Sequence, residues 1–158
     1  EDMDSRTPLQ GARVVAKAWT DPEYRKLLLT DGNAACEVLG IEGGIYKLVV
    51  VENTDDVHNV IVCTLCSCYP RWLLGLPPDW YKSRNYRSRV INEPREVLKE
   101  FGTEFASNTM VRVHDSTADM RYLVLPKRPA GTDGWSEDRL AALVTRDSMI
   151  GVAFATKP

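Results

Sequence analysis

The sequence predicts one α+β domain, in which a helical N-terminal arm precedes a layered α/β unit. Three observations support this prediction. The first forty residues show helical patterning, β-branched runs follow from position 46 onward, and helix-forming segments return later in the chain. A chain of 158 residues is long enough for a single domain with its own core. We expect the arm at residues 1–44 and the layered unit at residues 45–158.

The arm begins with an apolar-rich segment at residues 11–19. Asp21 followed by Pro22 predicts the start of a second helix, because aspartate caps helices and proline suits their first position. Gly32 and Gly40 are expected to end helices.

Two β-branched runs, 47–52 and 60–62, predict strands that a polar turn separates. Further along, residues 111–114 and 120–125 are predicted to form a hairpin through the polar link between them. The rest of the chain predicts helices: one over 80–91, one from Pro94 to Gly102, and a last one that Ser136 caps, with Leu140, Leu143 and Val144 at helical spacing.

Composition excludes several classes of protein. The net charge is −2, which argues against a protein whose main role is non-specific binding to nucleic acid or to an anionic membrane. No apolar run approaches the roughly 18 residues that a membrane-spanning helix needs. The first residues are acidic and show no secretory signal, so a cytoplasmic location is the simpler expectation.

Three of the four cysteines lie close together, at positions 63, 66 and 68, directly after the predicted strand 60–62. Clustered cysteines in a reducing compartment more often bind metal or perform redox chemistry than form disulfides. Cys36 stands apart among apolar residues and is expected to be a small core residue.

The cluster allows several chemistries. A zinc site would need a fourth ligand from Cys36, His58, His114 or a distant carboxylate, although for His58 a supporting role at the strand's polar end is the safer interpretation. A redox couple of Cys63 and Cys66 would leave Cys68 without a task.

A third arrangement uses all three cysteines. Cys66, Ser67 and Cys68 offer two sulfurs and the amide nitrogens of Ser67 and Cys68 in one plane, with the Cys63 sulfur as axial ligand. Such a claw favours a transition ion with square or octahedral preference, and its open position makes that ion a Lewis acid.

The loop VCTLCSC at residues 62–68 resembles the metal-binding loop of nitrile hydratase α subunits. The similarity spans most of the chain from Gly11 onward, and its clearest segments are residues 74–82, 86–90, 128–134 and 144–152. Thiocyanate hydrolase, whose γ subunit carries the same loop, is a close relative of this family.

The resemblance implies a metal-bearing subunit that hydrates a nitrile to its amide. It implies that Cys63 stays a thiolate, that Cys66 becomes a sulfinate and that Cys68 becomes a sulfenate, with Cys66, Ser67 and Cys68 as the catalytic residues. Thr64 indicates cobalt(III), because iron(III) members carry serine there. The resemblance also implies a β-type partner subunit, as one or two chains, whose arginines hold the oxidised cysteines, and an activator protein that delivers the metal.

Other positions gain candidate roles from the resemblance. Asp115, Asp119 and Arg121 match an acid-to-arginine network behind the loop; the simpler alternative is a surface hairpin with exposed ion pairs. Arg71 replaces a tryptophan that lines the pocket in many relatives, and Gly44 replaces a glutamine. We therefore expect a bulky or heteroaromatic nitrile.

The basic helix at 80–91 is expected to be a solvated face that is partly buried against the β-type partner, and not a nucleic-acid site. Two other functions stay open. One is hydrolysis of thiocyanate, an anion that Arg71 would attract. The other is a non-enzymatic cysteine module for metal binding or redox sensing.

Overall fold

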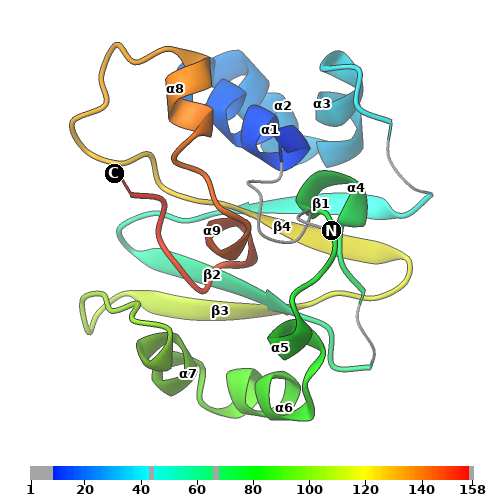
Figure 1. The fold of residues 1–158 in the computed structure, drawn as a ribbon, viewed down its shortest axis with the longest axis vertical. Helices are drawn as coiled ribbons and strands as arrows, with labels where there is room; N and C mark the ends of the chain where they lie inside the picture. The colour runs from blue at the N-terminus through cyan, green and yellow to red at the C-terminus, as the bar shows by residue number, and fades with distance from the viewer. Residues whose placement is uncertain (1–8, 43–44, 66–67, 157–158) are drawn as a thin grey trace.

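The computed structural model describes residues 9–42, 45–65 and 68–156 (Figure 1). The chain starts with α1 (Leu9–Thr20), α2 (Pro22–Thr30) and α3 (Gly32–Val38). The Asp21 carboxylate accepts the N–H groups of Glu23 and Tyr24, which confirms the predicted start of α2.

The prediction for Gly32 was wrong. Gly32 begins α3, and Asp31 caps that helix by accepting the Ala34 N–H. A Cβ at Gly32 would lie 2.6 Å from the carbonyl oxygen of Leu48, so the glycine permits a close approach of α3 to the next strand. Gly40 follows α3 with φ +73° and ends the helical region as predicted.

Four strands follow: β1 (Lys47–Glu52), β2 (Val57–Val62), β3 (Met110–Asp115) and β4 (Met120–Leu125). The strand segments were predicted, but the hairpin of β3 and β4 is wrong. β1 pairs in parallel with β4, and β2 pairs in parallel with β3. The link between β3 and β4 carries the chain from one pair to the other, because each strand finds its hydrogen-bonding partner far away in the sequence.

The helical second half contains α4 (Arg71–Leu74), α5 (Asp79–Lys82), α6 (Arg84–Asn92) and α7 (Pro94–Glu100). The single helix predicted over 80–91 is wrong. Ser83 has extended backbone angles, so it ends α5, and its hydroxyl then caps α6 by accepting the Tyr86 N–H at 3.1 Å. The hydroxyl competes with the helical backbone for that amide, which breaks the helix there.

Near the end of the chain, Ser136 caps α8 (Glu137–Ala141) as predicted. This is not the last helix. Thr145 and Ser148 form a capping box that starts α9 (Arg146–Ile150).

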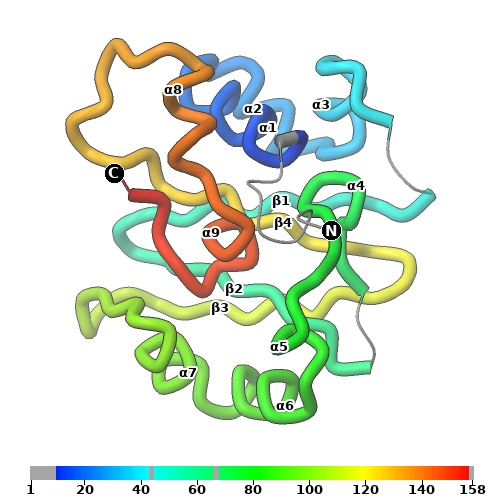
Figure 2. Tube along the Cα trace, in the orientation of Figure 1, coloured from blue at the N-terminus to red at the C-terminus, as the bar shows by residue number. Residues whose placement is uncertain are grey.

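The elements form layers around the strands (Figure 1). Helices α1, α2, α3 and α8 lie on one side, α5, α6 and α7 lie on the other, and α9 packs against β2 and β4. The tube view shows that the C-terminal segment returns to the middle of the molecule beside β2 (Figure 2). No helix in the described part of the chain is long and apolar enough to cross a membrane.

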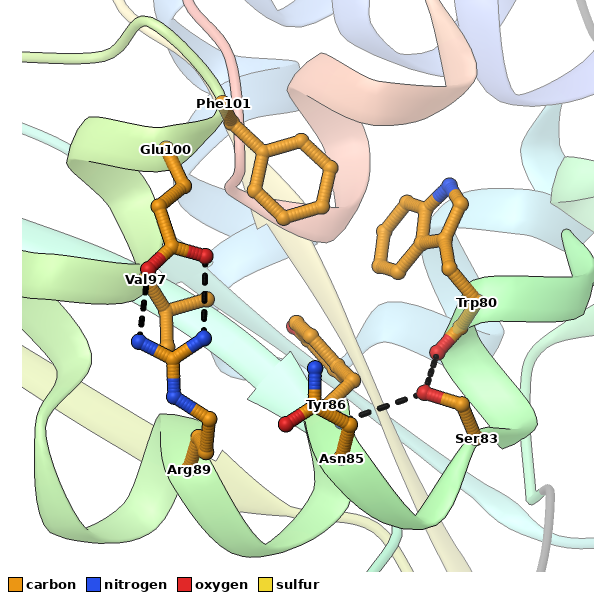
Figure 3. Close-up of a pocket in the computed structure, with 8 residues that line it drawn as sticks. All are labelled: Trp80, Ser83, Asn85, Tyr86, Arg89, Val97, Glu100 and Phe101. Atoms are coloured by element: carbon orange, nitrogen blue, oxygen red, sulfur yellow. Dashed lines mark hydrogen bonds and ion pairs between the residues drawn. The ribbon is translucent and has the colours of Figure 1, made fainter.

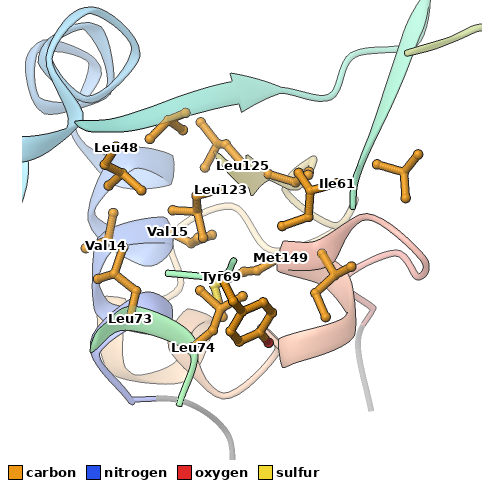
Figure 4. Packing of buried hydrophobic residues seen from close by; sticks show 14 of the residues in the cluster. Val14, Val15, Leu48, Ile61, Tyr69, Leu73, Leu74, Leu123, Leu125 and Met149 are labelled. Atoms are coloured by element: carbon orange, nitrogen blue, oxygen red, sulfur yellow. The ribbon is translucent and has the colours of Figure 1, made fainter. Parts of the chain in front are cut away.

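One core joins the layers. Val15 from α1, Ile61 from β2 and Met149 from α9 meet in it with Leu123 from β4 (Figure 4). Cys36 is buried in the same core, which confirms its predicted role in packing. The helices of the predicted arm therefore share their apolar contacts with the rest of the molecule.

Candidate metal centre

The cysteine loop starts where β2 ends, at the carboxyl edge of the parallel β2–β3 pair. Cys63 follows directly after the last residue of β2 and is 0% exposed, and Cys68 is 7% exposed. The predicted ligands Cys66 and Ser67 lie outside the described residues, as does Gly44. Two of the three predicted sulfur ligands are thus buried on one short loop.

Asp115 anchors the first half of the loop. It is the last residue of β3 and pairs with Val62, so the parallel ladder places its carboxylate beside the loop. The Thr64 N–H donates to Asp115 Oδ1 at 2.9 Å, and the Thr64 hydroxyl donates to Oδ2 at 2.7 Å. Both carboxylate oxygens therefore hold the residue next to Cys63.

Two side chains anchor the second half through consecutive carbonyl groups. The Tyr81 hydroxyl of α5 donates to the Cys68 carbonyl oxygen at 3.0 Å. Arg121 of β4 donates from Nη1 to the Tyr69 carbonyl oxygen at 2.8 Å, and its guanidinium lies 4.1 Å from the ring centre of Tyr46. The backbone that leaves the loop is held from two different elements.

Helix α6 supplies two further donors. The Tyr86 hydroxyl donates to the carbonyl oxygen of Ile61, two residues before Cys63, at 2.8 Å. Arg87 Nη1 lies 3.4 Å from the Thr64 carbonyl oxygen.

The expectation that residues 80–91 form a solvated basic face was incomplete. Lys82 and Arg84 are exposed, whereas Tyr81 and Tyr86 are buried and bind the loop region. The helical spacing of Tyr86 and Val90, both buried, is the sequence signal that could have indicated this inner face.

The other predicted residues take different places. The Asp119 carboxylate is exposed and makes no hydrogen bond or ion pair within the described ranges, while its backbone carbonyl accepts the Lys47 N–H. Arg71 is exposed at the start of α4, three residues after Cys68. The structure brings Asp115 and Arg121 to opposite ends of the loop and does not join the three residues into one network.

Both histidines have partners away from the loop. His58 is buried in β2, and its Nε2 lies 2.7 Å from the Gly151 carbonyl oxygen, so the expected place at a polar strand end is wrong. His114 Nε2 lies 2.7 Å from Asn59 Oδ1. Burial lowers the pKa of both imidazoles. Within residues 9–42, 45–65 and 68–156, no three His, Cys, Asp or Glu side chains form a group that could hold a metal.

Cys63 and Cys68, the two described members of the claw that the sequence predicts, have the chemistry that such a claw requires. Cys63 and Cys68 place two buried sulfur atoms on one short loop, and cysteine thiolates are strong ligands for transition metals. The loop backbone is fixed on both sides by Asp115, Tyr81 and Arg121. A chelate that uses backbone amides needs a backbone held in this way.

The family model described as nitrile hydratase, alpha chain, matches residues 1–153. The chain therefore belongs to the nitrile hydratase α-chain family, whose enzymes are hydro-lyases that work as multi-subunit complexes.

Individual relatives agree with this assignment. The cobalt-containing nitrile hydratase subunit alpha of Pseudonocardia thermophila is 62% identical over 148 residues, which are 92% of this chain and 72% of the relative. Thiocyanate hydrolase subunit gamma of Thiobacillus thioparus is 49% identical over 158 residues, which cover 92% of this chain and 65% of the relative. A double mutant of the Fe-type nitrile hydratase from Comamonas testosteroni Ni1 has a TM-score of 0.91 at 48% identity, over 99% of this chain and 78% of that one.

Proposed function

We propose that this chain is the metal-bearing subunit of a nitrile hydratase that converts a nitrile to its amide. The observation that supports this most is a pair of buried cysteines, Cys63 and Cys68, at the two ends of one short loop, whose first half is held by Asp115 and whose second half is held by Tyr81 and Arg121. Residues 45–158 would carry the centre, and residues 1–44 would form the arm that packs on it.

The ligands we propose are Cys63, Cys66, Ser67 and Cys68. Cobalt(III) is the proposed metal, because Thr64 stands at the position that separates cobalt from iron members and a cobalt-containing relative is 62% identical. Iron(III) is the alternative, since an Fe-type enzyme shares the fold. When bound, the trivalent ion would supply Lewis acidity that makes the nitrile carbon electrophilic.

The chain's own residues would prepare the site for the reaction. Asp115 keeps Thr64 in place, and Tyr81 and Arg121 keep the Cys68 and Tyr69 carbonyls in place, so the backbone is anchored at both ends of the loop. We propose that an oxidant of the peroxide class converts Cys66 to a sulfinate and Cys68 to a sulfenate, with one peroxide consumed and one water released for each oxygen atom added. The Cys68 oxygen, or a water molecule, would then add to the nitrile carbon.

The oxidised sulfurs would carry negative oxygens and need cationic donors. We propose that arginines of a β-type subunit, in one or two chains, supply them, that a separate activator protein delivers the metal, and that the complex works in the cytoplasm. The thiocyanate hydrolase relative makes hydrolysis of thiocyanate the second candidate. Arg71 supports that candidate, because it is exposed three residues after Cys68 and would attract an anion.

The experiment is to produce the chain with its partner subunits and the activator protein in cobalt-containing medium and to measure metal content, intact mass and activity. We expect about one cobalt per chain and three added oxygen atoms. A bulky heteroaromatic nitrile should react faster than acrylonitrile, because Gly44 removes a side chain from the expected pocket wall. Faster reaction of acrylonitrile would contradict that preference.

The other outcomes separate the functions. Turnover of thiocyanate alone would favour the hydrolase. A Cys63–Cys66 disulfide without metal would favour the redox module and overturn the proposed function.

A further inference from the structure

Helices α5 and α6 face the metal loop with a set of hydrogen-bond donors. Tyr81, Tyr86 and Arg87 point to the carbonyl oxygens of Cys68, Ile61 and Thr64, at 3.0, 2.8 and 3.4 Å. These carbonyls lie at the end of the loop, in the strand before it and in its first half. The short segment 81–87 therefore contacts both ends of the loop without contributing a ligand.

This segment is held rigidly from behind. Ser83 accepts the Tyr86 N–H and donates to the Trp80 carbonyl, which sets the break that lets α5 and α6 both present a tyrosine to the loop. Trp80 packs edge-on against Tyr86 and Phe101, with ring centres 4.9 and 4.8 Å apart.

A pocket of about 260 Å³ opens behind these rings (Figure 3). Across it, the two guanidinium nitrogens of Arg89 bind the two carboxylate oxygens of Glu100, which ties α6 to α7. The tyrosine hydroxyls thus project from a frame that is braced by aromatic packing and a two-point ion pair.

Tyr81 has the most direct link to a predicted ligand. Its ring is fully buried and lies 5.0 Å from the ring of Tyr69, the residue after Cys68. Its hydroxyl holds the carbonyl of the Cys68–Tyr69 peptide while Arg121 holds the next carbonyl. Because each peptide unit is planar, two fixed carbonyls fix the backbone angles of Tyr69 between them. They also limit rotation of the Cys68 backbone, and with it the direction of its Cβ and sulfur.

We propose that Tyr81 is a positioning residue for metal binding: its hydroxyl holds the Cys68 peptide in the chelating conformation before the metal enters. Tyr81 touches neither metal nor substrate. The loss of its hydroxyl would leave the buried Cys68 carbonyl without this donor and allow the loop exit to open more often. The link between this conformation and metal retention rests on the proposed function, whereas the hydrogen bond from Tyr81 to the Cys68 carbonyl is a property of the structure itself.

The test compares Tyr81→Phe with Tyr24→Phe in the complex, each produced with and without cobalt. Tyr24 is a matched control, because its hydroxyl is also buried and donates to a backbone carbonyl, that of Ala35, at 2.8 Å in the N-terminal helices. Both variants remove one buried phenol hydroxyl, so a general loss of stability would affect them alike.

Two quantities are measured. In the metal-free complex, amide hydrogen exchange of the peptide 68–75 should become about fivefold faster in Tyr81→Phe and stay unchanged in Tyr24→Phe. In the complex made with cobalt, metal content per chain should fall by at least about half in Tyr81→Phe only, with a matching loss of added oxygen in the intact mass.

The outcomes separate this proposal from the proposed function. If the wild type holds cobalt and the two variants show equal hydrogen exchange and equal cobalt content, the positioning role of Tyr81 is overturned. The proposed function would stand in that case. A wild type that holds no metal would overturn the proposed function. The exchange data from the metal-free complex would still decide whether Tyr81 holds the loop exit.

Discussion

At the scale of single residues, His58 shows how the fold uses a side chain that first looks like a metal ligand. It is buried in β2 between the rings of Phe105 and Phe154, at 4.9 and 5.6 Å. Its two ring nitrogens lie near Gly151 and Asn53. The polar atoms are satisfied within the protein, so His58 ties the C-terminal segment to β2.

This burial predicts a pH dependence of stability. Burial lowers the pKa of His58 in the folded state, while its contact with the Gly151 carbonyl raises it in part. The unfolded chain, with a histidine pKa of about 6.5, then binds the proton more readily than the folded chain. The contribution of neutral His58 to the free energy of unfolding should therefore be fully present above about pH 6.5. It should be lost as the pH falls below this value and through the lower pKa of the folded state.

Urea unfolding between pH 7 and pH 5 measures this effect, and His58→Asn provides the comparison. The variant should be less stable at pH 7 and should lose less stability toward pH 5. His114, whose pKa is lowered by burial and by Arg112, contributes in the same direction and remains in both proteins. Equal losses in wild type and variant would contradict the role assigned to His58.

At the scale of elements, α9 depends on the residue that ends it. Gly151 has φ +102°, in the left-handed region, and its N–H bonds the Asp147 carbonyl. A Cβ at this position would lie 2.2 Å from the Asn59 carbonyl oxygen and 2.7 Å from the Val60 Cα. The backbone of α9 thus approaches the backbone of β2 as closely as only glycine allows.

We expect Gly151→Ala to reduce the free energy of unfolding by about 3 kcal/mol or more, from backbone strain and the clash together. Gly134→Ala is the control: Gly134 has φ +78° but no heavy atom within 4 Å of the added Cβ. Gly134→Ala should reduce the free energy of unfolding by only about 1–2 kcal/mol, because it adds backbone strain but no clash. Urea unfolding measures the loss of free energy of unfolding in each variant. Similar losses in the two variants would show that the close approach of Gly151 to β2 does not contribute to stability.

At the scale of the whole molecule, the loop end of the β2–β3 pair carries an exposed apolar side chain. Leu65 is 83% exposed in the middle of the cysteine loop. A single exposed leucine is common on protein surfaces, but this one lies on the loop between two buried cysteines. The family works in multi-subunit complexes, so we expect Leu65 to be buried against the β-type subunit.

Leu65→Ser should weaken this association at least about tenfold, because the burial of one leucine contributes about 1.5–3 kcal/mol. Met110→Ser is the control, since Met110 is 54% exposed and begins β3 at the opposite end of the same strands. Co-purification and titration of the two subunits measure the change. If Leu65→Ser leaves the affinity between the subunits unchanged, or if Met110→Ser reduces it equally, the partner does not bind at Leu65.

The amino-acid sequence by itself determined the local features. Asp21 with Pro22, and Ser136, start helices because a cap needs only its own side chain and the next amides. Strand segments follow from β-branched runs, and the proposed donor set of the metal loop rests on cysteine spacing. These signals act over a few residues.

Only the tertiary structure decided which distant groups meet. The parallel pairing of β2 with β3, and not of β3 with β4, brings Asp115 to Thr64. The break at Ser83 turns Tyr81 and Tyr86 toward the loop. The four β-branched runs are too alike to select their own partners from sequence. The choice comes instead from burying the apolar faces of the strands in a core that they share with helices from distant parts of the chain.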